Sequence, residues 1–355
     1  MTLPIKGHSY APGPLGLLRG GDGGTTHAPV GALWDDGGWA PHPIGILWDR
    51  QTQAPPSGTA TKAAGKTTPM PLPAKDGNSK DVHVVRAPRF DPQTKLPSYT
   101  EVKQAENIAN CPVAAILAAY AFTKVGQPII QNMITETSGK VLTDLSGLPA
   151  GTLSNPPGDL TSDRYFTVNL PGAVRVDLSG ADKLPGATQV TGKPGIFDLA
   201  GGSIDVSDVL YTNDGDGGSW SLIYLRDPGG QTIWASIIEK ALAVRLGSYE
   251  NFDALNISAN DFWNMVTGAQ PAVIEIKPAT SLKVITDAAQ ASVNAPTIGA
   301  SKDVGTKFVT QFHGFAMLGS QNGKIRLYDA EKGKEIPPIS PENFRNDFKA
   351  ILYRK

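Results

Sequence analysis

The chain has 355 residues, of which 40% are hydrophobic and 18% are charged, and its formal net charge is −1. The apolar share is enough for a sizeable core, and a balanced charge without a basic stripe excludes a typical nucleic-acid partner. The longest strongly apolar run, residues 111–122, is too short to span a bilayer, so we expect no membrane association.

A single cysteine excludes an internal disulfide and fits a reducing compartment. The first residues lack the apolar core of a signal peptide. The sequence therefore predicts a cytoplasmic protein, or one that is exported without a cleavable signal peptide.

Residues 1–95 are rich in Gly, Pro, Thr, Ala and Ser and show little periodicity, which predicts an extended or disordered tail. One folded domain is expected over residues 96–355. Within the tail, residues 29–35 and 43–49 share the pattern Pro-x-Gly-x-Leu-Trp-Asp. We interpret these copies as candidate docking motifs for a partner, with drift in a low-complexity tail as the alternative. The tail could also lie in a cleft of the domain as a pro-segment.

The first element expected in the folded part is a helix over residues 112–124, where apolar residues recur at helical spacing before Gly126. A second helix is expected over 233–246, ended by Gly247. Short runs of strand-forming residues predict the strands 165–168, 173–176, 272–276, 315–318 and 324–328. Helices first and strands later predict an α+β fold with a helical lobe and an antiparallel sheet lobe.

Residues 213–218, Asn-Asp-Gly-Asp-Gly-Gly, have the composition of a calcium loop. Their spacing fails the EF-hand pattern, and no Glu closes the loop. We interpret the segment as a hairpin turn and expect neither a metal nor a cofactor.

Cys111 stands directly before Pro112, and proline is favoured at the first position of a helix. At a helix N-terminus, the dipole and the unpaired backbone N–H groups favour a thiolate and can also donate to a developing oxyanion. Cys111 is therefore a candidate nucleophile. A buried, inert cysteine is the alternative interpretation.

A nucleophilic thiol needs a base, and His313 is the one histidine of five that lies outside the tail. Asp329 ends a predicted strand sixteen residues later, and the Asn322-Gly323 pair predicts a hairpin between the two strands. Asp329 could then accept a hydrogen bond from the imidazole. A structural histidine and an ordinary acidic residue at a strand end are the alternatives.

Several segments together resemble the calpain family of cysteine proteases. Residues 233–250 resemble the family segment W-x-x-L-x-E-K-A-Y-A-K-L-x-G-S-Y-E, which is a long and specific match. Four further segments are similar to its nucleophile helix G-D-C-W-F-L-A-A-L, its base motif G-H-A-Y, its strand ending in N-P-W-G and its closing D-F-x-x-x-F segment: residues 110–119, 312–315, 325–329 and 340–348. The resemblance covers about residues 100–355, in the family's order.

The resemblance implies a papain-like, two-lobed fold and a thiol protease that cleaves peptide bonds through a thioester acyl-enzyme. Its substrate would be a protein or peptide. Cys111 would be the nucleophile and His313 the base, while Asp329 would replace the family's Asn. Gln104 would supply the oxyanion donor, although it lies seven residues before the cysteine instead of six. Calcium control, known in animal calpains, is not carried over.

Two departures from the family keep other functions open. Pro112 replaces the Trp after the cysteine, and the Trp after the family's Asn is missing, so a catalytically impaired binding module is one alternative. The order Cys, His, Asp is also found in transglutaminase-like proteins. Acyl transfer or deamidation on a glutamine side chain is therefore the other alternative.

Overall fold

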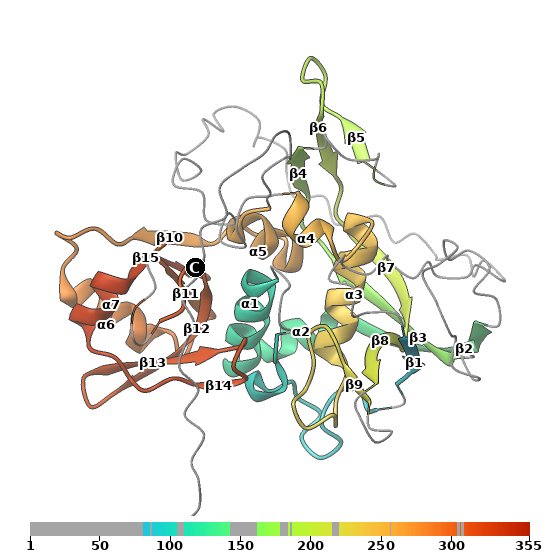
Figure 1. Ribbon diagram of the computed structural model, residues 1–355, viewed down its shortest axis with the longest axis horizontal. Helices are drawn as coiled ribbons and strands as arrows, with labels where there is room; N and C mark the ends of the chain where they lie inside the picture. The colour runs from blue at the N-terminus through green and yellow to red at the C-terminus, as the bar shows by residue number, and fades with distance from the viewer. Residues whose placement is uncertain are drawn as a thin grey trace, which may run out of the picture.

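The computed structural model describes residues 81–85, 87–104, 110–142, 162–177, 184, 187–214, 220–255, 257–303, 306 and 309–355. Within these ranges the chain has an α+β fold in which antiparallel sheets lie on either side of the helix α1 (Cys111–Phe122) (Figure 1). The two Trp-containing repeats, and with them the proposed docking role of the tail, lie outside the described residues.

Helix α1 is the central element of the core. The sequence predicted it at 112–124, and it spans Cys111–Phe122 with Pro112 in its first turn. All of its residues except the last are buried, as expected for a helix that is apolar on every side. It packs against β12 (Gly314–Gln321) and β11 (Thr297–Ser301) of one sheet and against α2 (Gln127–Met133) and α5 (Ala259–Thr267).

No single helix among the described residues is long and apolar enough to cross a membrane. By length and composition alone, α1 and α2 together would suffice, but their axes differ by 117°.

The larger sheet has six antiparallel strands in the order β10-β15-β11-β12-β13-β14. These strands are β10 (Ala272–Glu275), β11 (Thr297–Ser301), β12 (Gly314–Gln321), β13 (Lys324–Asp329), β14 (Lys334–Glu335) and β15 (Phe348–Tyr353). Alternate side chains of β12 enter two different clusters: Phe315 and Met317 join one, and Ala316 and Leu318 join the core around α1. Helices α6 (Leu282–Ala291) and α7 (Pro341–Asp347) contribute to the first cluster, so both faces of the sheet are covered.

The hairpin predicted between β12 and β13 is confirmed. Gln321 pairs with Lys324, and the two turn residues, Asn322 and Gly323, have φ angles of 51° and 73°. Positive φ at both central positions is the geometry that the Asn-Gly pair favours in tight hairpins. The hairpin carries the chain back along β12, so that Asp329 at the end of β13 lies near the start of β12.

The other half of the molecule also contains strands, at the predicted residues 165–168 and 173–176 and elsewhere, so the elements do not follow the expected order of helices first and strands later. Three small antiparallel sheets have the orders β1-β8-β9, β2-β3-β7 and β4-β6-β5. Their strands are β1 (Asp81–Val84), β2 (Ile134–Leu142), β3 (Ser162–Leu170), β4 (Val174–Asp177), β5 (Ala187–Gln189), β6 (Ile196–Leu199), β7 (Gly202–Ser207), β8 (Val209–Asp214) and β9 (Trp220–Leu222). The predicted α+β class is correct, but the strands are distributed over the whole domain.

Helix α3 (Trp234–Leu246) agrees with the predicted helix to within one residue. Gly247 ends it with a φ of 86°, a left-handed conformation that glycine adopts without steric cost. The described residues also include a short 3-10 helix, η2 (Tyr99–Glu101), and a short α-helix, α4 (Asn251–Ala254).

The expected boundary between tail and domain at residue 95 is too late. Strand β1 pairs along its whole length with β8, and Val85 and Phe90 are buried in the main core. The four residues Asp-Val-His-Val alternate polar and apolar side chains, a strand signal too short to stand out next to a low-complexity segment.

Candidate active site

Cys111 is the first residue of α1 and is 6% exposed. Its Sγ donates a weak hydrogen bond, at 3.9 Å, to the carbonyl oxygen of Phe312, the residue before His313, and the thiol interacts electrostatically with the His313 imidazole. The structure therefore brings together the two side chains that the sequence singled out as nucleophile and base.

Gly314 lets the sheet approach the helix closely at this point. A Cβ at this position would lie 3.1 Å from the Cβ of Ala115 and 3.3 Å from the carbonyl oxygen of Cys111. Both distances are tighter than most real Cβ contacts. Because Gly314 directly follows His313, this close contact between β12 and α1 sets how near the imidazole comes to the thiol.

The hydrogen bond predicted between His313 and Asp329 is present, with 3.0 Å between Nε2 and Oδ1. Oδ1 also accepts the backbone N–H groups of Glu331 and Lys332, and Oδ2 accepts the Lys332 ammonium at 2.8 Å. These contacts fix the carboxylate. Nε2 is therefore the ring nitrogen that Asp329 engages.

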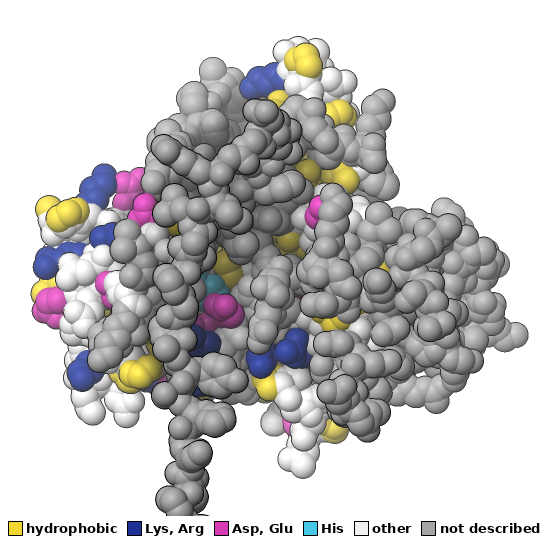
Figure 2. Space-filling model, viewed as in Figure 1, with side chains coloured by type: hydrophobic (Ala, Val, Ile, Leu, Met, Phe, Trp, Pro, Cys, Tyr) yellow, Lys and Arg dark blue, Asp and Glu magenta, His cyan; other side chains and the backbone are white. Residues whose placement is uncertain are grey.

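Burial of the His313 imidazole acts to lower its pKa, but the hydrogen bonds and charges of Asp329 and Cys111 outweigh burial and raise the pKa to about 10. Burial acts to raise the pKa of Asp329, yet His313 and Lys332 lower it to about 2. The favoured state near neutral pH is therefore an imidazolium hydrogen-bonded to a carboxylate. Figure 2 shows a histidine side chain next to acidic side chains near the middle of this face of the molecule.

The backbone of His313 is held by Ser301, a residue that sequence reasoning missed. The His313 N–H donates to Ser301 Oγ at 2.8 Å, and the Ser301 N–H donates to the His313 carbonyl at 2.9 Å. The preceding Phe312 has a φ of 49°, which is uncommon for a bulky side chain, and its N–H donates to the carbonyl of Lys302. Such strain is found where the surrounding structure enforces the geometry of a site.

Gln104 is buried, and its backbone N–H donates to the carbonyl of Ala330 at 2.7 Å. This bond places Gln104 next to the end of β13, one residue beyond Asp329. Residues 105–109, which join Gln104 to the start of α1, lie outside the described residues. The candidate oxyanion residue thus belongs to the same neighbourhood as the His313–Asp329 pair.

Glu239 is a second residue whose part in this region was not foreseen. It is fully buried on α3, where its Oε1 accepts a hydrogen bond from Asn110 Nδ2 and its Oε2 accepts the Leu225 N–H at 2.7 Å. Burial raises the pKa of this carboxyl to about 8, although both hydrogen bonds oppose the shift. The signal in the sequence was the resemblance of residues 233–250 to a known motif, because this segment contains Glu239. The resemblance did not show what the glutamate side chain does.

The next residue, Lys240, is also buried but points elsewhere. Its ammonium donates to the carbonyls of Ser207 and Val209, at 3.0 and 2.6 Å. Burial lowers the pKa of this amine to about 7. Glu239 and Lys240 therefore do not pair with one another, and of the two it is Glu239 that contacts the residue before Cys111.

Among the described residues, one group could be considered for a metal: His313, Asp329 and Glu331 offer ligand atoms within 4.8 Å of one another. Asp329, however, already accepts the Lys332 ammonium and two backbone N–H groups. A cation next to this ammonium would be repelled, so the group fits proton chemistry better than metal binding. Residues 215–218 of the segment interpreted as a hairpin turn lie outside the described residues.

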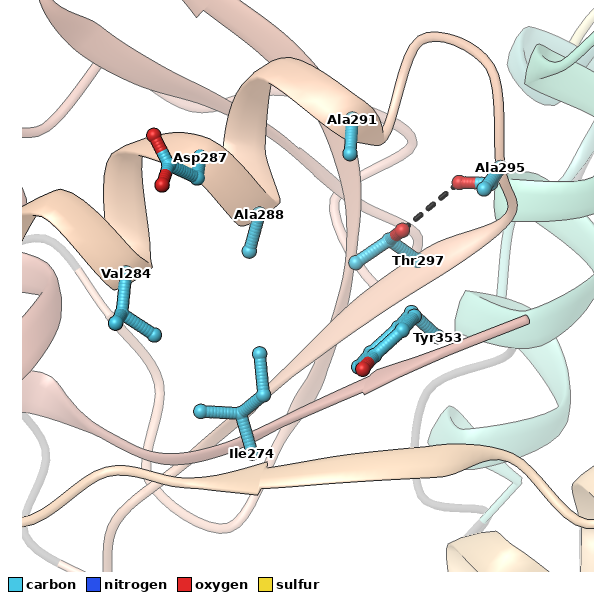
Figure 3. Close-up of a pocket in the computed structure, with 8 residues that line it drawn as sticks. All are labelled: Ile274, Val284, Asp287, Ala288, Ala291, Ala295, Thr297 and Tyr353. Carbon is cyan, nitrogen blue, oxygen red and sulfur yellow. Dashed lines mark hydrogen bonds between the residues drawn. The ribbon is translucent and has the colours of Figure 1, made fainter. Parts of the chain in front are cut away.

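A cavity of about 300 Å³ lies beneath α6, away from this site, between the helix and strands β10, β11 and β15 (Figure 3). Its wall is mostly apolar, with Ile274, Val284 and several alanines around the ring of Tyr353. The hydroxyl group of Thr297, which also lines the cavity, donates to the Ala295 carbonyl at 2.8 Å. The cavity holds no pairing of a nucleophile with a base, so the candidate site is the group around Cys111.

Comparison with models of known protein families and with curated protein sequences gave no match.

Proposed function

We propose that the protein is a cysteine-dependent hydrolase that cleaves peptide bonds through a thioester intermediate. The observation that carries the proposal is that Cys111, His313 and Asp329 lie together at the N-terminus of a buried helix, with the imidazole hydrogen-bonded to the carboxylate. A thiol, a base and a group that orients the base are the minimum for nucleophilic catalysis by cysteine.

The arrangement of elements supports a papain-like, calpain-type fold as part of the same proposal. The nucleophile is supplied by a buried helix, and the base and its carboxylate are supplied by two neighbouring strands of an antiparallel sheet. The similarity of residues 233–250 to the calpain segment adds to this, since the segment contains Glu239, which contacts the residue before Cys111.

In the first step, the Cys111 thiolate attacks the carbonyl carbon of the scissile peptide bond. The carbonyl electron pair moves to oxygen, where the Cys111 N–H and the Gln104 side chain would donate hydrogen bonds. The imidazolium of His313 then gives its proton to the leaving amine as the C–N bond breaks. A thioester to Cys111 and a free amine are the products of this step.

In the second step, neutral His313 takes a proton from water, and the hydroxide attacks the thioester. The C–S bond breaks, the acid product leaves, and Cys111 returns as a thiolate beside the imidazolium. Throughout both steps Asp329 orients the ring and stabilises its protonated form.

The proposal is tested by alkylating the purified protein with iodoacetamide between pH 4 and pH 9 and by assaying protein substrates for new N-termini. We expect Cys111 to react at pH 6 much faster than a free thiol, because the proposed mechanism requires a nucleophile activated by His313. The Cys111→Ala variant should release no new termini. A reaction at pH 6 no faster than that of a free thiol would exclude the activated nucleophile.

One observation favours a second candidate function. The orienting group is the carboxylate of Asp329, as in transglutaminase-like Cys-His-Asp sites, so the acyl group could come from a glutamine side chain. Mass spectrometry of the treated substrates separates the two reactions: cleavage gives new termini, whereas the alternative gives deamidated or cross-linked glutamines in intact chains. A fast-reacting Cys111 with neither product would favour the binding module.

A further inference from the structure

Asn110, the residue before Cys111, occupies the N-cap position of α1 but does not use its side chain as a cap. Asparagine at this position normally accepts a hydrogen bond from a backbone N–H of the first helical turn. Here its amide instead donates to the Glu239 carboxyl, a residue 129 positions away on α3. Both side chains are 0% exposed, so the contact is made inside the core.

The other carboxyl oxygen of Glu239 reaches toward the segment that contains Gln104. Oε2 accepts the N–H of Leu225, and Ser236, one turn earlier on α3, donates to the carbonyl of the same residue. The next residue, Arg226, exchanges two backbone hydrogen bonds with Lys103, at 2.7 and 2.9 Å. Gln104 follows directly.

One buried carboxyl group therefore holds both ends of the segment 105–109. At one end it binds Asn110, the residue before Cys111, directly. At the other end it acts on Lys103, the residue before Gln104, through Leu225 and Arg226. These ends carry the proposed nucleophile and the proposed oxyanion donor, which must stay in a fixed geometry during the reaction.

We infer that Glu239 is a positioning residue that sets the Cys111 end of α1 and the Gln104 segment relative to each other, an inference that rests on the proposed function. Glu239 does not touch substrate and transfers no proton in the reaction. It acts through two hydrogen-bonding contacts, so a substitution that preserves both contacts should preserve the geometry of the site.

The variants follow from these contacts. Glu239→Gln keeps the shape and can still accept from Leu225, while the Asn110 amide can turn to accept from the new amide group. Glu239→Leu has a similar volume but makes neither contact, and Asn110→Ala removes the Cys111 branch alone. Lys240→Met is the matched control, since it removes a neighbouring buried charge whose partners, Ser207 and Val209, lie away from the site.

The readout is the rate of Cys111 alkylation by iodoacetamide as a function of pH, with circular dichroism and the melting temperature recorded for each variant. We expect Glu239→Leu and Asn110→Ala to slow alkylation at pH 6 by about tenfold or more, because small displacements in an active site cost up to ~100-fold. Glu239→Gln and Lys240→Met should stay within about threefold of the wild type, on the same scale. In a double-variant cycle, Asn110→Ala should add little to Glu239→Leu, as for two residues that act through one contact.

Folded Glu239→Leu and Asn110→Ala proteins that both react at the wild-type rate would overturn the inference. If Glu239→Leu does not fold, the alkylation rate of Asn110→Ala alone tests the inference. If neither variant folds, the Asn110–Glu239 contact is needed only for folding, and the inference is also overturned. A wild-type protein whose Cys111 reacts like a free thiol would instead remove the proposed function. The two failures are therefore distinguishable.

Discussion

Nε2 of His313 lies 3.0 Å from Oδ1 of Asp329, and the two residues stand on the neighbouring strands of one hairpin unit, His313 just before β12 and Asp329 at the end of β13. Both side chains are almost completely buried, with 5% and 0% of their surface exposed. In a buried pair of this kind, the protonation state of the imidazole depends on the carboxylate.

Asp329→Asn should destabilise the protein near pH 6 by about 3 kcal/mol, the usual cost of removing one partner from a buried ion pair. The folded pKa of His313 is raised from 6.5 to about 10, so its contribution is complete below pH 6.5 and is lost as the pH rises toward 10. The folded pKa of Asp329 is lowered from 3.8 to about 2, so its contribution is lost as the pH falls from 3.8 toward 2. Urea unfolding of both proteins from pH 2 to pH 10 checks this. A difference that does not vary with pH would contradict it.

Gly314→Ala should slow Cys111 alkylation at pH 6 by about tenfold. The added methyl group would push β12 away from α1, and this small displacement would move His313 away from Cys111. The added methyl would lie 3.1 Å from Ala115 and 3.3 Å from the Cys111 carbonyl oxygen. Gly202→Ala is the control, since a Cβ there meets nothing within 4 Å. Equal alkylation rates for the two variants would show that the close contact at Gly314 does not determine the position of His313 relative to Cys111.

Ser301→Ala should lower the free energy of unfolding by about 1–3 kcal/mol, because it leaves the buried His313 N–H without its acceptor. Ser292→Ala is a matched control: Ser292 is equally buried, accepts the Gly319 N–H at 2.8 Å and donates to the Ala289 carbonyl at 2.8 Å. Denaturant unfolding should give similar losses for both variants. Only Ser301→Ala should also slow alkylation of Cys111. A similar slowing in both variants would mean that it results from the loss of stability and not from the contact with His313.

Gln104→Ala should lower kcat by about 100- to 1000-fold with little change in KM, as expected for loss of one oxyanion donor. Alkylation of Cys111 by iodoacetamide forms no oxyanion and should stay near the wild-type rate. The control is Gln127→Ala, whose amide donates to the carbonyls of Pro97 and Ala121. An unchanged kcat in Gln104→Ala would remove Gln104 from the reaction.

Lys240→Met should change how stability depends on pH in the alkaline range. Burial lowers the pKa of this amine from 10.5 to about 7, so between these values the unfolded chain binds a proton that the folded protein does not. The wild type should therefore gain stability relative to the variant as the pH rises from 7, by at most about 1.4 kcal/mol per pH unit. Thermal unfolding of both proteins at pH 7, 8 and 9 measures this. A constant difference would mean that the amine stays charged in the folded state.

The elements that the sequence predicted are those with a local physical cause. Pro112 marks the start of α1, Gly247 ends α3, and Asn322 with Gly323 forms the turn between β12 and β13, because each residue type restricts or permits particular backbone angles. The last of these predicted that His313 and Asp329 lie near one another, since a tight hairpin places its two strands side by side. The register between the strands shifts by one residue between Met317 and Ser320, which the turn alone does not predict. The candidate residues Cys111 and His313 could likewise be named from their types and positions.

The tertiary structure alone decided which of these residues meet. Cys111 and Phe312 are 201 positions apart, and Asn110 and Glu239 are 129 apart, so no local rule relates them. Their contacts depend on how closely β12 packs against α1, which requires the missing Cβ of Gly314, and on α3 placing a carboxyl group behind the start of α1. Packing of this kind is a sum of many weak contacts over the whole core, and for that reason it could not be read from any one segment of the chain.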